Sequence, residues 1–358
     1  METERASPRF SDIDRWEPGD ILDALIESQM AAVAAVRAAL PAIQQAAAAM
    51  QTRLSGTGRL IYVGAGTSGR LAVQDGAELI PTFNWPPERL LLLMAGGKDA
   101  LLRSAEGAED QIDEAARLIR QHRIEPVDVI IAVAASGTTP FTVACMREAK
   151  RRGAFAIGIA NNRGTPLLIE ADCPILLETG PEPIAGSTRM KAGTAQRVAL
   201  NLLSTLVMIR LGRVHEGLMV DVQAVNAKLV GRSQNILRRL SGRSEHDLRD
   251  ALERAGGNVK KAMLICTAAR PTKPPLFCRR PAGGCGSRCD LQVAPKRTFR
   301  LWTPTLHPPY RIRWKKSELR RGALTIQPVL ATRSSCISRS SNWGKSLSGI
   351  MLGPSDGA

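Results

Sequence analysis

Three loops of this chain combine glycines with hydroxyl side chains directly before a predicted helix. They are residues 64–70 (GAGTSGR), 134–140 (AASGTTP) and 186–196 (GSTRMKAGTAQ). Glycines let backbone N–H groups approach a ligand, hydroxyls donate hydrogen bonds, and a helix N-terminus favours negative charge. This combination indicates the binding of a phosphorylated small molecule. Simple helix capping by the same hydroxyls is an alternative that the sequence leaves open.

The first loop also matches the G-x-G-x-x-G pattern of dinucleotide-binding folds. That use requires an acidic residue at the end of the second strand, about 20 residues further on. Here Glu88 precedes the predicted strand 89–94, and Ala95-Gly96-Gly97 follows it. Thr67 and Ser68 suit a compact phosphate better than a pyrophosphate that is held mainly by backbone. We therefore discount a nicotinamide cofactor.

Five apolar runs alternate with helical segments in the body of the chain. The predicted strands cover residues 59–63, 89–94, 129–133, 155–160 and 173–178. This alternation is typical of the α/β class with a doubly wound parallel sheet. In such sheets ligands bind beyond the carboxyl ends of the strands, which is where the first two loops lie.

Helical segments precede and follow this sheet in the sequence. We divide the chain into an N-terminal helical arm (residues 1–54), a sugar-phosphate-binding domain (55–215), a helical region with a small helical cap (216–265) and a tail (266–358). An apolar stripe in the arm suits packing on a partner subunit; it consists of Ile21, Leu22, Leu25, Ile26 and Met30. Further helices are predicted at 192–211 and 219–240. In the cap, Gly256-Gly257 is expected to stop a helix and Asn258 to cap the next one.

The tail differs from the rest of the chain in composition. Residues 266–358 hold 17 Lys and Arg against 3 Asp and Glu, five of the seven cysteines and ten of the 22 prolines. They supply +14 of the net charge of +16. A basic tail can bind nucleic acid, and cysteines can bind zinc, but the paired cysteine spacing of structural zinc sites is missing. Because out-of-frame GC-rich DNA yields the same enrichment, we hypothesise a frameshift near Cys266 and a disordered tail, and expect neither metal nor nucleic acid.

The first residues, the length of the apolar segments and the cysteines indicate the cellular compartment. Residues 1–5 are acidic rather than apolar, and no segment reaches the roughly 18 uninterrupted apolar residues of a membrane span. Only Cys145 and Cys173 fall in the body, which suits reduced thiols. We therefore expect a cytoplasmic protein without membrane contact.

The three loops and the stretch Glu106-Gly107-Ala108-Glu109-Asp110 carry a family resemblance. From Thr3 to Ile265 the chain resembles the sugar isomerase (SIS) domain family, and within it the N-acetylmuramic acid 6-phosphate etherases; glucokinase regulatory proteins share much of the third loop. The resemblance implies a homodimer that cleaves the D-lactyl ether of N-acetylmuramic acid 6-phosphate, giving N-acetylglucosamine 6-phosphate and D-lactate. Elimination followed by water addition achieves this without a metal or redox cofactor. A non-catalytic sugar-phosphate sensor of the regulatory type is the alternative, and an aldose–ketose isomerase is a weaker one.

The same resemblance implies roles for individual residues. Glu78 and Glu109 occupy the two catalytic positions, and we assign Glu78 as general acid and Glu109 as the base at C2; the two labels can be exchanged. Glu109 is expected at the start of a helix that runs to about Ile119, where a carboxylate would also stabilise the helix N-terminus. The implied substrate-binding residues are Gly66, Thr67, Ser68, Ser136, Gly137, Thr138, Thr139, Ser187 and Lys191.

Overall fold

The computed structural model describes residues 1–103, 105–222 and 227–268. Its centre is one parallel sheet of β1 (Leu60–Gly64), β2 (Leu90–Met94), β3 (Val129–Val133), β4 (Phe155–Ala160) and β5 (Cys173–Leu176). The spatial order is β2-β1-β3-β4-β5, so the chain reverses direction across the sheet between β1 and β3. All five predicted strands are confirmed, β3 and β4 with the predicted bounds and the others with ends shifted by one or two residues. In doubly wound sheets ligands bind beyond the carboxyl ends of the strands where the order reverses, which here are β1 and β3.

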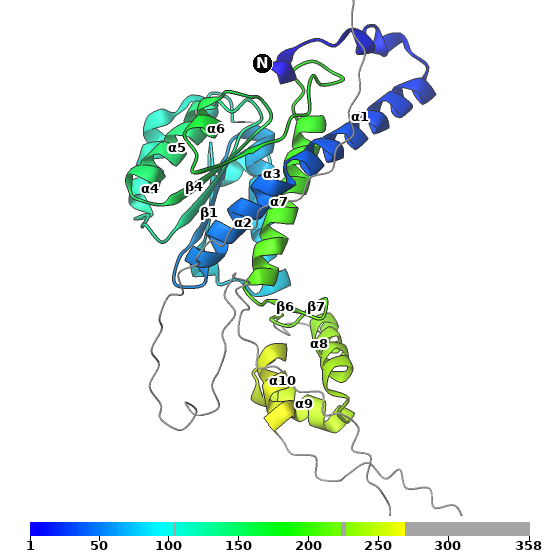
Figure 1. Ribbon diagram of the computed structural model, residues 1–358, viewed down its shortest axis with the longest axis vertical. Helices are drawn as coiled ribbons and strands as arrows, with labels where there is room; N and C mark the ends of the chain where they lie inside the picture. The colour runs from blue at the N-terminus through cyan, green and yellow to red at the C-terminus, as the bar shows by residue number, and fades with distance from the viewer. Residues whose placement is uncertain (104, 223–226, 269–358) are drawn as a thin grey trace, which may run out of the picture. The chain divides into compact units, whose positions relative to one another are not determined.

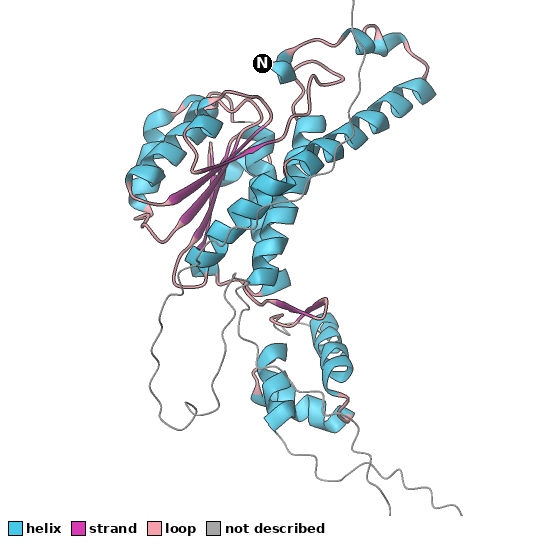
Figure 2. Ribbon diagram, viewed as in Figure 1, coloured by secondary structure: helices cyan, strands magenta, loops and turns pink. Residues whose placement is uncertain are grey.

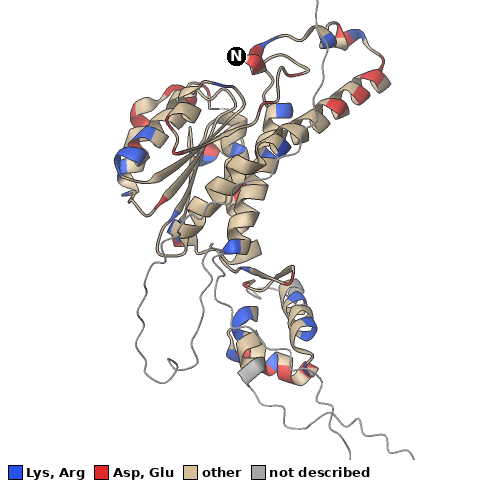
Figure 3. Ribbon diagram, in the orientation of Figure 1, with Lys and Arg blue, Asp and Glu red and all other residues tan. Residues whose placement is uncertain are grey.

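Helices cover both faces of this sheet (Figures 1 and 2). One face carries α2 (Leu40–Leu54), α3 (Gly66–Phe83) and α7 (Lys191–Arg210), and the other carries α4 (Ile112–Gln121), α5 (Pro140–Arg151) and α6 (Pro166–Ile169). Successive residues of a strand point to opposite faces, so Tyr62 joins the first apolar core and Val63 the second. Because both faces are covered, none of the five strands contains a charged residue. Figure 3 shows the Lys, Arg, Asp and Glu residues on the helices and loops around the sheet.

The N-terminal arm forms two helices where one helical stretch was expected. Before them lie three short 3-10 turns, η1 (Glu2–Glu4), η2 (Pro8–Phe10) and η3 (Ile13–Arg15). Helix α1 (Pro18–Ala38) is followed by its C-cap residue Ala39. Helix α2 begins directly afterwards, with Pro41 in its first turn. Proline has no N–H to continue a helix, which explains the break. The arm lies against α7, which α1 and α2 both contact.

The segment after α7 begins as a hairpin. A helix was predicted from residue 219, but β6 (Val214–His215) and β7 (Leu218–Met219) pair antiparallel, and α8 covers Ala227–Ser241. The turn uses Glu216 and Gly217, both at positive φ, a turn signal that the helix prediction missed. The small cap is confirmed as α9 (Glu245–Arg254) and α10 (Val259–Ala268). Asn258 caps α10 as predicted, since its Oδ1 accepts the Lys261 N–H at 2.9 Å.

Residues 269–358 lie outside the described residues, and with them lies nearly all of the predicted tail. Two short 3-10 turns, η4 (Pro87–Arg89) and η5 (Lys98–Leu101), flank β2. Within the described ranges, no helix combines the length and apolar character that crossing a bilayer requires.

Candidate functional site

In the β1–α3 loop the backbone at the start of α3 lies very close to the backbone at the end of β1. A Cβ at Gly69 would lie 2.8 Å from the carbonyl carbon of Gly64, so only glycine lets α3 begin this close to the end of β1. No hydrogen bond within the described chain uses the backbone N–H groups of Gly66, Thr67 and Ser68. The Ser68 side chain is buried beneath them. The first turn of α3 therefore offers unused donors at a positive helix end, as an anion site requires.

The loop after β3 holds its hydroxyls in a fixed arrangement. The Ser136 Oγ lies 3.2 Å from the Thr139 Oγ1 and accepts the Thr138 N–H at 3.2 Å. Gly137 has φ +72°, and a Cβ there would lie 2.2 Å from the Thr165 Oγ1. Thr138 is exposed at the tip, while Ser136 and Thr139 are half-buried. The predicted hydroxyls thus stand together at the carboxyl end of β3.

The third loop leads into a helix end that the chain itself occupies. The Glu182 carboxylate, fully buried, accepts the backbone N–H of Lys191 at 2.9 Å and of Ala192 at 2.8 Å. The Gly193 N–H donates to the Thr188 carbonyl at 2.8 Å. The sequence suggested that this helix N-terminus would bind an external anion, but an internal carboxylate takes its first donors. Any role of this loop in binding falls to its side chains.

Two predicted binding residues of this loop differ in their surroundings. Ser187 is half-buried, whereas Lys191 is 6% exposed. Burial lowers the pKa of the Lys191 ammonium, the nearby Glu182 carboxylate raises it, and the Arg9 guanidinium lowers it again. Arg189 is exposed and forms no ion pair among the described residues. Cationic charge therefore gathers beside the loop that holds Ser187.

Glu109 lies at the same edge of the sheet as the first two loops. It was expected at the start of a helix, but it belongs to the separate turn η6 (Ala108–Asp110), and α4 begins only at Ile112. Its neighbour Ala108 is buried against Gly96, which follows β2, since a Cβ at Gly96 would lie 3.3 Å from the Ala108 Cβ. The turn η6 also contacts α5, the helix that follows the loop of residues 134–139. The exposed Glu109 thus lies at the carboxyl end of β2, on the side of the sheet where both hydroxyl loops lie.

Glu78 lies far along α3 from the loop that starts it. The helix is 18 residues long. At 1.5 Å per residue, Glu78 is about 18 Å further along the axis than Gly66. Its side chain is exposed. Within one chain, the two predicted catalytic glutamates therefore stand at different places, Glu109 at the carboxyl end of β2, on the side of the hydroxyl loops, and Glu78 more than three helical turns away.

A buried polar cluster that sequence reasoning missed lies one turn before Glu78. The Asp75 carboxylate, 3% exposed, accepts the Tyr62 hydroxyl at 2.9 Å and the Ser204 hydroxyl at 3.3 Å. Burial raises the pKa of Asp75, while both hydrogen bonds lower it. Gly76 lets α3 pack closely against the sheet, since a Cβ at this position would lie only 2.5 Å from the Leu92 side chain. This cluster ties the middle of α3 to β1 and α7.

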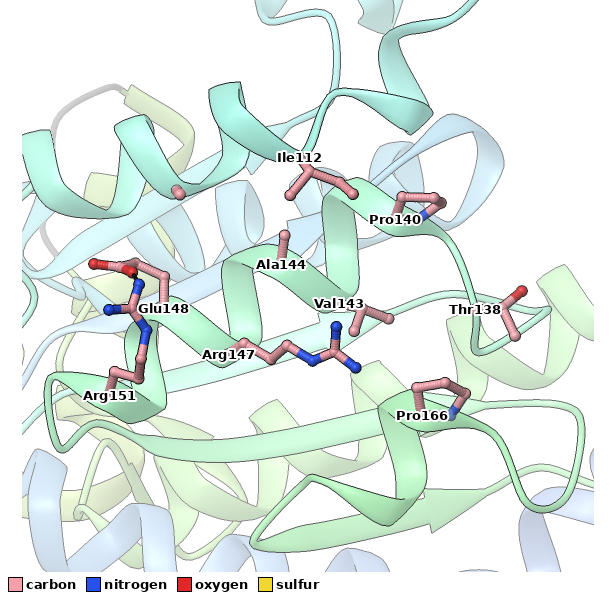
Figure 4. Close-up of a pocket in the computed structure, with 10 residues that line it drawn as sticks. Ile112, Thr138, Pro140, Val143, Ala144, Arg147, Glu148, Arg151 and Pro166 are labelled. Carbon is pink, nitrogen blue, oxygen red and sulfur yellow. Dashed lines mark ion pairs between the residues drawn. The ribbon is translucent and has the colours of Figure 1, made fainter.

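A groove of about 410 Å³ runs along α4, α5 and α6. Figure 4 shows Thr138 at one end and the Glu148–Arg151 ion pair at the other. Its Arg147 is paired with Glu170. Thr138 is the only predicted site residue that lines it, so the groove is not the place where the described site residues gather. In the described part of the chain, no three His, Cys, Asp or Glu side chains are grouped to hold a metal ion.

Comparison with known proteins identifies the family. Residues 42–150 match the glucokinase regulatory protein N-terminal SIS domain, and residues 112–206 match the SIS domain. A Deinococcus radiodurans protein named N-acetylmuramic acid 6-phosphate etherase is 50% identical over 265 residues, which cover 74% of this chain and 86% of that protein. The chain belongs to the N-acetylmuramic acid 6-phosphate etherase family.

A second relative and a solved structure are also similar to this chain. A family member from Synechococcus is 45% identical over 267 residues, covering 74% of this chain and 84% of that protein. A solved phosphoheptose isomerase from Francisella tularensis is 21% identical, with a TM-score of 0.40; the match covers 54% of this chain and 98% of that structure.

Proposed function

We propose that this chain cleaves the lactyl ether of N-acetylmuramic acid 6-phosphate. The 50% identity to a relative named for that etherase activity, over most of both chains, is the observation that carries the proposal. The products are N-acetylglucosamine 6-phosphate and D-lactate. The unused N–H groups of Gly66, Thr67 and Ser68, with the hydroxyls of residues 136–139, would bind the phosphate.

The chemistry is an elimination followed by an addition. In the open-chain sugar the aldehyde acidifies the C2 proton, and a carboxylate removes it while the C3–O bond breaks. A carboxylic acid gives its proton to the departing lactyl oxygen, and water then adds at C3 of the unsaturated aldehyde. We assign proton removal at C2 to Glu109, because its turn lies at the carboxyl end of β2 and contacts α5, on the same side of the sheet as the loops that would hold the phosphate. Glu78 is the proposed acid.

The position of Glu78 supports a site shared between two copies of the chain. Because α3 carries Glu78 about 18 Å from Gly66, a site at the β1/β3 edge would take its second glutamate from a partner subunit. The exposed apolar side chains of α1 support a homodimer: Leu22, Ile26 and Met30 are 66%, 59% and 67% exposed at helical spacing. We also propose a cytoplasmic location, which the free thiols of Cys145 and Cys173 suit.

A lactate-release assay on the phosphorylated muramic sugar tests this function. Glu109→Gln and Glu78→Gln should each reduce lactate release by about 100-fold or more, since each removes one proton-transfer group. Binding of the phosphosugar, followed by calorimetry, should persist in both. Glu106→Gln and Glu88→Gln, which change exposed glutamates near the same segments, are the matched controls and should retain the wild-type rate.

The alternatives give different outcomes in the same experiment. A sensor of the regulatory type would bind the phosphosugar without releasing lactate in the wild type. An isomerase would form a ketose from an aldose phosphate and leave the ether intact. Either result would refute the proposed function.

A further inference from the structure

The third residue of the chain is fully buried, although its neighbours are exposed. Thr3 is 0% exposed in the short turn η1, whereas Glu2 and Glu4 lie at the surface. Specific hydrogen bonds hold Thr3 in this buried position.

The first of these contacts is a reciprocal pair with Asn162, which follows β4. The Thr3 N–H donates to the Asn162 Oδ1 at 3.3 Å, and the Asn162 Nδ2 donates to the Thr3 Oγ1 at 3.0 Å. The same Nδ2 donates to the Ala135 carbonyl at 2.9 Å. Ala135 belongs to the loop that carries Ser136, Thr138 and Thr139. Asn162, 4% exposed, thus connects Thr3 to the hydroxyl loop.

The second contact joins Thr3 to the loop that holds Ser187. The Gly186 N–H donates to the Thr3 carbonyl at 3.1 Å. Gly186 has φ +75°, and a Cβ there would lie 2.8 Å from the Glu4 Oε2. A side chain at this position would be strained by the positive φ, and the exposed Glu4 carboxylate would have to move aside. Thr3 thus joins Ala135 and Asn162 to Gly186 at the start of the third loop, while Asn161 separately joins the Ala135 carbonyl to Gln196 on α7.

We propose that Thr3 is a positioning residue that fixes the loop of residues 134–139 relative to the loop of residues 184–191. The proposal rests on the proposed function in that both loops contribute to binding the phosphosugar. When Thr3 loses its bonds, each loop keeps its own internal hydrogen bonds and the connection from Ala135 through Asn161 to Gln196 remains, but residues 184–188 are held less firmly relative to residues 134–139. Substrate binding then orders both loops at a greater entropic cost, while the proton-transfer groups remain in place.

Kinetics on Thr3→Val tests this role. The variant keeps the shape and removes the hydroxyl acceptor, so KM should rise about fivefold, the scale of one hydrogen bond. Turnover, kcat, should stay within about twofold because chemistry is not altered. Thr3→Ser should restore the wild-type KM. The control is Thr52→Val, the same change at an exposed threonine on α2. An unchanged KM in Thr3→Val, or a fall in kcat alone, would overturn the proposal.

A second variant breaks the other end of the connection. Gly186→Ala should raise KM as well, and the double variant with Thr3→Val should raise it by less than the product of the two single effects, because both act through one connection. Multiplicative effects would mean that the two contacts work separately, which contradicts the proposal.

Hydrogen exchange separates this proposal from the proposed function. In Thr3→Val without ligand, backbone N–H groups of both loops should exchange faster, while those of the β-sheet keep their protection. Unchanged exchange in either loop contradicts the coupling. If the wild type releases no lactate, the etherase proposal fails, but this measurement still decides whether Thr3 couples the loops.

Discussion

Glu182 and Lys191 meet at the N-terminus of α7, where the Glu182 carboxylate accepts the Lys191 backbone N–H at 2.9 Å. The same carboxylate accepts the Ala192 N–H at 2.8 Å, so a buried internal anion occupies the end of this helix. An external phosphate would find these donors already taken. This supports the proposed phosphate site at α3, whose first N–H groups are unused in the described chain, and at the adjacent hydroxyl loop.

Glu182→Ala should destabilise the protein substantially. The substitution leaves two buried helix-end donors without an acceptor and removes a favourable charge from the helix N-terminus, so the free energy of unfolding should fall by about 2 kcal/mol. Urea denaturation measures this. Glu88→Ala, at an exposed glutamate, should change the unfolding free energy by less than about 0.5 kcal/mol. Equal costs for the two variants would contradict the capping role.

Asp75 should give stability an unusual pH dependence. Burial raises its pKa above the ordinary 3.8, against the effect of the Tyr62 and Ser204 hydrogen bonds. Between pH 3.8 and the raised pKa, Asp75 keeps its proton in the folded protein, whereas the unfolded chain has lost it. The contribution of Asp75 to unfolding free energy therefore falls as pH rises from 3.8 to the raised pKa, and it is level above that pKa.

Comparison with Asp75→Asn isolates this effect, because every other group titrates in both proteins. From about pH 4 to about pH 7, the unfolding free energy of the wild type should fall relative to that of the variant. Urea titrations at several pH values measure the difference. A difference that stays constant, or that grows in favour of the wild type, would show that Asp75 does not have a raised pKa in the folded state.

The apolar stripe of α1 should hold two copies of the chain together. Ile26→Glu and Met30→Glu place charge on side chains that are 59% and 67% exposed in the single chain, so they should convert a dimer into monomers. Size-exclusion chromatography with light scattering measures the mass. Ala31→Glu adds the same charge at an exposed position outside the stripe and should leave the dimer intact. A wild-type protein of monomer mass would disprove the proposed dimer.

The sheet was predictable because its signals are local. Each strand is a short apolar run such as residues 129–133, and each is followed by loop residues and a helix, so both type and order could be inferred. The errors also have local causes. The break between α1 and α2 depends on Pro41, and the hairpin at Glu216-Gly217, just before the predicted helix 219–240, depends on two positive φ angles.

The connections within the candidate site were not predictable in this way. Thr3 and Asn162 are 159 residues apart in sequence, and neither carries a local signal of pairing. Glu182 stands nine residues before Lys191 in a Pro- and Gly-rich stretch, where a carboxylate reads as a loop residue. Only the tertiary structure brings each pair together. The position of Glu109 at the carboxyl end of β2 depends likewise on a tertiary contact, the packing of Ala108 against Gly96.

Mixed dimers should reveal whether Glu78 and Glu109 of one site come from different subunits. Glu78→Gln and Glu109→Gln proteins are each expected to be inactive alone. In a mixed dimer, a shared site would combine Glu109 of the first variant with Glu78 of the second, while the other site would lack both glutamates. After random exchange of subunits, half the dimers are mixed and each has one intact site of two, so lactate release should return to about one quarter of the wild-type rate. If one chain supplied both glutamates, no site would be intact and mixing would restore nothing. The same mixture made in the Met30→Glu background should also stay inactive, because that variant is expected to prevent the dimer.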